Sequence, residues 1–278
     1  MKIKFWGVRG SIPSPGSATL RYGGNTSCTS VHLKGDRTLV LDAGTGIRNL
    51  GKALLADTTD IYILISHNHW DHIQGFPFFA PLYQPDRTVF VFQTPYEKRR
   101  LCALVDQMDG AHFPVKADEL PSDYQCVEEE MLTFLAAHGF NIARIDTNHP
   151  GGGFGYRVEE NGRSMVYLTD NELEPPYPRA TGFEEFVRFC QGSDVLIHDA
   201  QYREDDMPHK HGWGHSLVSQ VCELARAAEV QNLILYHHDP DRSDTELDAI
   251  QEEANSRLQK MGQNIRCTVA YEGLEVEL

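Results

Sequence analysis

Three histidines and one aspartate stand within six consecutive residues, in the run His67-Asn68-His69-Trp70-Asp71-His72. The run directly follows residues 60–65, an apolar stretch with the composition of a buried strand. Neutral imidazole and carboxylate groups are the ligands expected of zinc and similar divalent ions, and a catalytic site leaves positions open for water. The spacing H-x-H-x-D-H after a strand therefore predicts a catalytic metal site.

Three more candidate ligands follow other predicted strands. His149 lies in the turn N-H-P-G, where proline and glycine favour a tight reversal of the chain. Asp170 and His237 each follow a short apolar stretch. A histidine at a strand end is by itself more often a hydrogen-bonded loop residue than a ligand, but the run at 67–72 strengthens the metal interpretation. Together the candidates suffice for two ions if one carboxylate bridges them: His67, His69, Asp71, His72, His149, Asp170 and His237.

Strands and helices must recur in both halves of the chain to position these residues. Hydrophobic patterning predicts strands over residues 2–8, 29–34, 38–42, 60–65, 88–93, 142–147, 155–159, 164–168, 194–198, 232–236 and 265–271. It predicts helices over residues 46–56, 95–108, 183–191, 216–228 and 247–261. We expect an α/β fold of two sheets flanked by helices, with the site along one rim. Residues 1–278 are expected to form one domain, with an irregular insertion near residues 110–130.

Composition is that of a globular protein, with 41% hydrophobic and 23% charged residues in a chain of 278. No apolar run approaches the roughly 18 residues that a membrane span needs. The N-terminus lacks a signal-peptide core and reads as a strand. The six cysteines are scattered, which indicates buried thiols in a reducing compartment rather than a disulfide framework. We expect a cytoplasmic protein with no membrane partner.

Net charge restricts the choice of substrate. The chain has 25 basic and 40 acidic residues, a formal charge of −15, and its one basic cluster is Lys98-Arg99-Arg100. Long nucleic acids are gripped by neutralising many phosphates, so this balance argues against such a partner. A small anionic substrate held by metal ions is easier to accommodate.

With His149, Asp170 and His237 in order behind it, the loop H-N-H-W-D-H resembles the metallo-β-lactamase superfamily. The resemblance extends from the first strand to about Asp239 and implies an αββα sandwich of two mixed β-sheets flanked by helices. Asp42, in L-D-A-G-T-G, matches the family's buried aspartate, which orients a metal-bound imidazole. The implied ligands of one ion are His67, His69, His149 and Asp170. Those of the other are Asp71, His72, His237 and the bridging Asp170.

The region from residue 195 to residue 239 is similar to the ribonuclease Z and phosphodiesterase branch. V-L-I-H-D-A-Q-Y is followed by G-H-S and then by L-I-L-Y-H. The resemblance implies that Asp199 orients His215 and that His215 faces the scissile phosphate, although the branch usually has glutamate at position 199. Position 69 is histidine, where the redox diiron branch has glutamate, which argues against oxygen or nitric oxide reduction. No cysteine is among the ligand candidates, which argues against a true β-lactamase. A glutathione-binding extension of the thioesterase type is not evident. Asp71, His215 and Asp199 are the expected catalytic residues.

The favoured hypothesis is a binuclear metal-dependent phosphodiesterase acting on a small phosphodiester such as a cyclic nucleotide. Two divalent ions can share an attacking hydroxide and bind phosphoryl oxygens in an in-line displacement. Zinc is the default metal, with manganese or iron as alternatives, and the resemblance allows a homodimer. A ribonuclease Z-like endonuclease that processes tRNA 3′ ends is an alternative, but its basic arm has no clear counterpart. A lactonase or other acyl hydrolase using the same metals is another.

Three neighbouring features receive weaker interpretations. Trp70 is expected to pack as a spacer between ligands, and the aromatic cluster at residues 76–83 to form core, a dimer contact or a base-stacking wall. Arg21 is expected to be solvated rather than bound to a substrate phosphate.

Overall fold

The computed structural model describes residues 1–92, 102–127, 130–262 and 264–278. Residues 95–101 of the predicted helix at 95–108, and the whole cluster Lys98-Arg99-Arg100, fall outside these ranges. The chain folds into two compact units. Unit 1 comprises Met1–Pro15, Gly23–Met131 and Tyr271–Glu277. Unit 2 comprises Gly16–Tyr22, Leu132–Ala270 and Leu278. The expectation of one domain over residues 1–278 stays a prediction.

Within its described residues, unit 1 contains a seven-stranded mixed sheet in the order β13-β1-β2-β3-β4-β5-β6. Neighbours from β13 to β3 are antiparallel, and those from β3 to β6 are parallel. The interior strand β4 is buried along its whole length, as expected of a parallel strand covered on both faces. The strands are β1 (Lys2–Gly7), β2 (Cys28–Leu33), β3 (Arg37–Leu41), β4 (Ile61–Leu64), β5 (Thr88–Phe92), β6 (Asp123–Cys126) and β13 (Glu275–Glu277).

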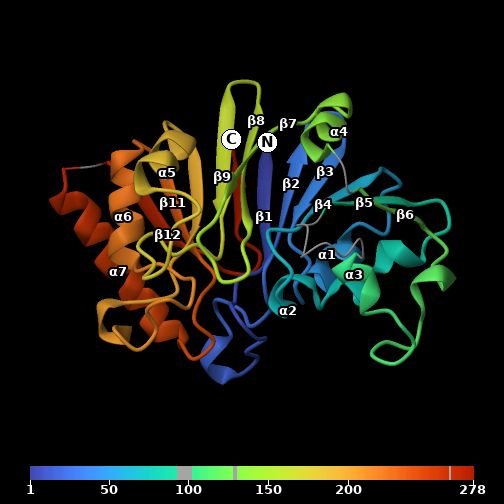
Figure 1. Cartoon of the computed structure of the whole chain (residues 1–278), viewed down its shortest axis with the longest axis horizontal. Helices are drawn as coiled ribbons and strands as arrows, with labels where there is room; N and C mark the ends of the chain where they lie inside the picture. Colours follow the sequence, from blue (N-terminus) through green and yellow to red (C-terminus); the bar gives the residue numbers. More distant parts are fainter. Residues whose placement is uncertain (93–101, 128–129, 263) are drawn as a thin grey trace. The chain divides into compact units, whose positions relative to one another are not determined.

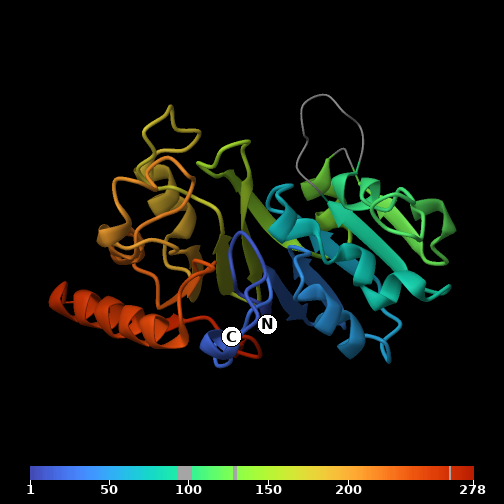
Figure 2. The same cartoon turned by 90° about the horizontal axis from the view of Figure 1, so that it is seen from below.

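Short helices pack around this sheet and complete the core of unit 1. α1 (Ile47–Ala53) contacts β1 and the 3-10 turns η2 (Phe76–Phe78) and η3 (Ala80–Tyr83), and α3 (Ala103–Asp106) contacts η2. Aliphatic residues from β4 and β5 meet Phe76 and Phe79 in one buried cluster. β13 pairs with β1, so the two ends of the chain lie side by side (Figures 1 and 2).

Unit 2 contains a six-stranded mixed sheet in its described part, in the order β12-β11-β10-β9-β8-β7. β9 to β12 are parallel, while β7, β8 and β9 are joined as antiparallel neighbours. The strands are β7 (Asn141–Asp146), β8 (Phe154–Glu160), β9 (Arg163–Leu168), β10 (Val195–Asp199), β11 (Asn232–Tyr236) and β12 (Arg266–Val269).

Three helices lie together beside β11 and β12 in Figure 1: α5 (Phe183–Cys190), α6 (Val218–Ala227) and α7 (Asp244–Lys260). α7 begins with a capping box in which the Ser243 hydroxyl accepts from the Glu246 amide and the Glu246 carboxylate accepts from the Ser243 amide. Its buried positions recur with helical spacing at Leu247, Ile250, Ala254 and Leu258. Two mixed sheets flanked by helices therefore confirm the predicted fold class.

Most predicted elements coincide with observed ones to within a few residues, but four helices and strands in the described part of the chain were not predicted, among them α2 (Trp70–Ile73). Residues 110–130, expected to be irregular, include the turn η4 (Ala117–Glu119) and the edge strand β6. α4 (Met131–Ala137) and β13 were not predicted. β6 is only four residues long and alternates between exposed and half-buried positions, so it lacks the apolar run that marks a buried strand.

Cysteine usage differs from the expectation at one pair. Cys102 and Cys126 form a disulfide between the start of α3 and the end of β6, which the even scatter of cysteines in sequence did not indicate. The remaining four, Cys28, Cys190, Cys222 and Cys267, are buried thiols, as predicted. None of the helices in the described part of the chain has the length and hydropathy of a membrane span.

Candidate metal centre

The ligand-rich loop of unit 1 follows β4 and turns into the short helix α2 (Trp70–Ile73). His69 has extended backbone angles and marks the start of α2, so His67 and His69 stand on an extended segment and Asp71 and His72 on a helical turn. The His67 ring lies 4.4 Å from the His69 ring and 4.3 Å from the His72 ring, measured between centroids. His72 Nε2 lies 3.3 Å from Asp71 Oδ2. Within unit 1 the structure therefore brings all four predicted ligands together.

Asp42 supports this loop from the end of β3. Its Oδ1 accepts a hydrogen bond from the Ser66 amide at 2.7 Å, and its Oδ2 accepts one from the Ser66 hydroxyl at 2.9 Å. Oδ2 also lies 2.8 Å from His72 Nδ1, and Asp42 is fully buried. Since a carboxylate accepts, Nδ1 of His72 carries the proton and its Nε2 presents a lone pair. Asp42 adopts a left-handed φ of 62°, a strain of about 1–3 kcal/mol that the surrounding contacts must hold.

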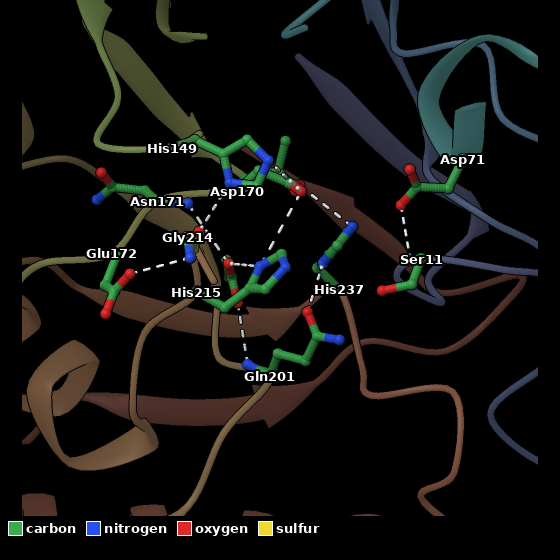
Figure 3. A network of polar contacts seen from close by, with 12 residues as sticks. Ser11, Asp71, His149, Asp170, Asn171, Glu172, Gln201, Gly214, His215 and His237 are labelled. Carbon is green, nitrogen blue, oxygen red and sulfur yellow. Dashed lines mark hydrogen bonds and ion pairs between the residues drawn. The ribbon is translucent and has the colours of Figure 1, made fainter. Parts of the chain in front are cut away.

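Glycines allow the loop after Asp42 to pack directly against α2. The Ala43 amide donates to the His72 carbonyl at 2.7 Å, and the Gly75 amide donates to the Ala43 carbonyl at 2.9 Å. A Cβ on Gly44 would lie 2.2 Å from the Asp71 carbonyl oxygen, so no side chain fits there. A third support comes from Ser11, whose amide donates to Asp71 Oδ2 at 2.7 Å (Figure 3).

In unit 2 the candidate ligands come from separate segments and meet around Asp170 (Figure 3). His237 Nε2 lies 3.1 Å from Asp170 Oδ2, and His149 Nε2 lies 3.8 Å from Asp170 Oδ1. Asp170 follows β9 and His237 directly follows β11, and both have left-handed φ values, 49° and 58°. All three side chains are buried. Sharp reversals at the carboxyl ends of parallel strands thus aim these groups at one point.

Each of these histidines is held through its other ring nitrogen. His149 Nδ1 donates to the Gly214 carbonyl at 3.0 Å, and His237 Nδ1 lies 3.3 Å from the Gln201 side-chain oxygen. An oxygen acceptor at Nδ1 fixes the proton there, which leaves Nε2 of each ring with its lone pair directed at Asp170.

The donor sets therefore fit divalent ions in both units. His72, His149 and His237 all have Nδ1 engaged by an oxygen and Nε2 facing a carboxylate. A lone pair facing a carboxylate oxygen is repulsive unless a cation lies between them, and imidazole with carboxylate is a ligand set of zinc and related metals. Within unit 2, one nitrogen or oxygen from each of His149, Asp170 and His215 lies within 4.8 Å of the others.

His215 and Asp199 form a buried pair beside Asp170. His215 Nδ1 lies 2.6 Å from Asp199 Oδ2 and 4.0 Å from Asp170 Oδ1. The other Asp199 oxygen accepts from the Gln201 amide at 2.9 Å, so the carboxylate is fixed in place. The aspartate side chain, one methylene shorter than glutamate, still reaches His215.

Rings of neighbouring residues surround the His215 ring, and the His149 ring is one of them, at 5.4 Å between centroids. The His237 ring stacks on it at 5.1 Å, and the Tyr202 ring stands edge-on to it at 5.5 Å. Burial and the charge of Asp199 raise the pKa of the Tyr202 hydroxyl well above its ordinary value, so this wall stays neutral.

Sequence reasoning predicted the support from Asp42 but missed the other residues that support the ligands. Glu172 is buried, and its two carboxylate oxygens accept from the Gly212 and Gly214 amides at 2.8 and 2.9 Å. It thereby holds the loop that supplies the Gly214 carbonyl to His149. The sequence signal that could have pointed to Glu172 is the run T-D-N-E, which has a second acidic residue two positions after Asp170. Ser66, Gln201 and the Ser11 amide carry no comparable signal.

Of the weaker interpretations, the one for Trp70 is wrong. Trp70 is 81% exposed, so it does not pack as a spacer. The side chain has no cover because α2 buries only Asp71, His72 and Ile73. The aromatic cluster divides, with Phe76 and Phe79 in the core and Phe78 55% exposed. Arg21 is partly exposed, as expected, but its guanidinium binds the Asp248 carboxylate of α7.

Residues 37–238 match a protein family described as the β-lactamase superfamily domain. Among curated proteins, the chain is 27% identical to a Ribonuclease Z of Thermoplasma acidophilum, over 94% of this chain and 92% of that one. It is 22% identical to a Ribonuclease Z of Haloarcula marismortui, over 85% of this chain and 86% of that one.

Solved structures show the same fold. The metallo-β-lactamase fold protein YhfI of Bacillus subtilis superposes with a TM-score of 0.71 at 19% identity, covering 99% of both chains. A diphosphatase of the PhnP family has a TM-score of 0.67 at 19% identity, covering 100% of this chain and 97% of that one. Zinc-bound PqqB of Methylobacterium extorquens has a TM-score of 0.65 at 18% identity, covering 100% of both chains.

Proposed function

The chain belongs to the metallo-β-lactamase superfamily, and from this premise we propose that it is a metal-dependent phosphodiesterase acting on a small phosphodiester such as a cyclic nucleotide. The observation that carries the proposal is the Asp199–His215 pair, which stands beside the Asp170 cluster and is buried with it.

Two divalent ions would be held by ligands from both units. One ion would take His67, His69, His149 and Asp170, and the other would take Asp71, His72, His237 and the shared Asp170. The fixed imidazole tautomers and the facing carboxylates in each unit support this assignment. Zinc is favoured because the ligand set suits it and because PqqB, which has the same fold, was solved with zinc. Manganese and iron are alternatives.

Bound in this way, the metal pair would supply a water of lowered pKa and positive charge for phosphoryl oxygens. The side chains near the metals would then transfer protons and orient the reacting groups. Asp199 holds the Nδ1 proton of His215, which directs the Nε2 side of the ring toward substrate. A protonated His215 could transfer its Nε2 proton to the departing alkoxide oxygen or stabilise charge on the phosphate. Asp71 is proposed to combine its ligand role with a part in catalysis, its carboxylate being oriented by the Ser11 amide.

A tRNA-processing endonuclease is the second candidate, because the two curated relatives described above are named Ribonuclease Z. The net charge of −15 argues against a long polyanion. Within the described part of the 110–130 segment, acidic residues such as Asp118, Glu119 and Asp123 replace the basic arm that a tRNA would need. We therefore place the small diester first.

A substrate panel on metal-replete protein tests the proposal, with metal content measured on the same sample. We expect turnover of bis(p-nitrophenyl) phosphate and of at least one cyclic nucleotide, and no turnover of lactones or thioesters. Cleavage of precursor tRNA at low enzyme concentration would favour the second candidate. Turnover of lactones alone would contradict both.

A further inference from the structure

A cavity of about 220 Å³ opens beside His215 within unit 2. It lies outside the candidate ligands and is formed by the segment after Asp170, the loop before His215 and the first turn of α6. The lining residues are Glu172, Glu174, Met207, Pro208, His211, His215, Leu217 and Gln220.

Apolar and polar groups, including the two carboxylates Glu172 and Glu174, make up its walls. Met207, Pro208 and Leu217 supply an apolar surface large enough for an aromatic ring or a sugar. The Glu174 carboxylate stands on the polar side, where Gln220 Nε2 donates to its Oε2 at 3.1 Å. Gln220 is itself fixed, because its Oε1 accepts from the Leu217 amide at 3.1 Å.

Most other polar groups of the cavity already have partners inside the protein. Both oxygens of Glu172 accept from the backbone amides of the loop before His215. His211 Nε2 donates to the Glu174 carbonyl at 2.9 Å. The Glu174 carboxylate is exposed, so the cavity offers an occupant a negative charge beside an apolar face.

We propose that this cavity receives the leaving alcohol of the diester and selects an uncharged or cationic alcohol over one that carries a carboxylate or a second phosphate. The inference rests on the proposed function, because a leaving oxygen that takes its proton from His215 must lie on the side of the substrate that His215 faces. A negative group there would meet Glu174, and like charges at close range repel even where water partly screens them. The proposal makes Glu174 a specificity residue that would disfavour a polynucleotide, which has phosphates on both sides of the scissile bond.

Two methyl aryl phosphodiesters test it, identical except that the leaving phenol carries either an aminomethyl or a carboxylate group in the para position. The quantity measured is the ratio of kcat/KM for the cationic and anionic diesters, in the metal-replete wild type and in Glu174→Gln and Glu174→Lys. Intrinsic reactivity cancels between variants. We expect the ratio to fall about fivefold in Glu174→Gln, the effect of one partly exposed charge pair, and to fall further in Glu174→Lys.

Glu184→Lys is the matched control, because Glu184 is an exposed glutamate on α5 outside the cavity. It changes the net charge equally and should leave the ratio as in wild type. If both diesters are hydrolysed and the kcat/KM ratio is the same in wild type and in both position-174 variants, the cavity proposal is overturned while the proposed diesterase function stands. Hydrolysis of neither diester, nor of bis(p-nitrophenyl) phosphate, would overturn the proposed function and the cavity proposal with it.

Discussion

The two units present their candidate ligands in different ways. In unit 1 the four ligands lie within six residues, and Asp42 alone holds both the Ser66 backbone and the His72 ring. In unit 2 the ligands come from distant segments, and each has its own support: Gly214 for His149 and Gln201 for His237. A contiguous loop can share one anchor, whereas dispersed ligands need one anchor each.

Backbone strain follows the same division. In unit 1 the left-handed residues Asp42 and Ser11 are supports rather than ligands, but in unit 2 the ligands Asp170 and His237 are themselves left-handed. Strain of this kind persists only where surrounding contacts over-determine it. Unit 2 should therefore be more sensitive to small changes in its loops, and unit 1 to the loss of Asp42, which holds both a ring and a backbone amide.

The largest effect is expected at Asp170, the centre of the unit 2 cluster. Asp170→Asn keeps a residue type that tolerates a left-handed φ but removes the charge. Metal content should fall and diesterase activity should drop to the assay background. Elemental analysis and turnover check this, with the exposed Asp205→Asn as control. Full metal occupancy in Asp170→Asn would contradict the bridging role.

His215→Ala should separate chemistry from metal binding. We expect turnover to fall by about 10²–10⁴, the usual contribution of a general acid, with metal content unchanged. His209→Ala, a substitution of an exposed histidine in the same loop, is the control. Wild-type turnover in His215→Ala would remove His215 from the mechanism.

Asp42→Asn tests the shared anchor against an individual one. Metal affinity should fall by about 10–100-fold, as is usual when the partner of a ligating histidine is lost. Gln201→Ala in unit 2 should cost less, because Gln201 holds one ring at 3.3 Å and Asp42 holds a ring and a backbone amide. Chelator competition measures both affinities. A larger loss of metal affinity in Gln201→Ala than in Asp42→Asn would contradict the role of Asp42 as a shared anchor.

Gly214→Ala tests the sensitivity of the unit 2 loops. A Cβ there would lie 2.1 Å from His149 Nδ1, and the φ is +92°. Gly192→Ala has a φ of +63° with open space around the new Cβ, so it isolates the backbone cost. We expect Gly192→Ala to lower the free energy of unfolding by about 1–2 kcal/mol and Gly214→Ala to lower it by more. Equal losses in chemical denaturation would mean that the contact with His149 is relieved without cost.

His198 should give the smallest effect, a loss of stability in acid. Burial lowers the pKa of this fully buried imidazole below its ordinary value. In the unfolded chain the pKa of this imidazole is about 6.5, so below that pH the unfolded chain binds a proton that the folded protein does not. The stability that neutral, buried His198 contributes is therefore present above about pH 6.5 and is lost as the pH falls below it. Comparing urea unfolding of wild type and His198→Leu at pH 7.5 and pH 5.5 isolates it. A pH-dependence identical in the two proteins would contradict the assignment.

The sequence predicted what periodicity and local clustering encode. Buried strands such as β4 and β11 were placed within a residue or two because their apolar runs are continuous. The loop at 67–72 was recognisable because its ligands are adjacent in sequence. Both sheets and most helices followed from the same patterns.

What the sequence could not predict depends on tertiary contacts. Strand β6 is polar and owes its conformation to pairing with β5, and the disulfide joins two cysteines that only the fold brings together. Glu172 and Gln201 act through backbone amides and a ring nitrogen whose positions follow from the loops, so residue type alone could not assign them. The exposure of Trp70 reflects which face of a four-residue helix is covered, which so short a period cannot reveal.

Titration of metal-free protein with zinc tests the central claim most directly, with bound metal and hydrolysis of bis(p-nitrophenyl) phosphate followed together. Two ions per chain should bind, and hydrolysis should appear as the second site fills. Full hydrolytic activity with one ion or none would contradict the account.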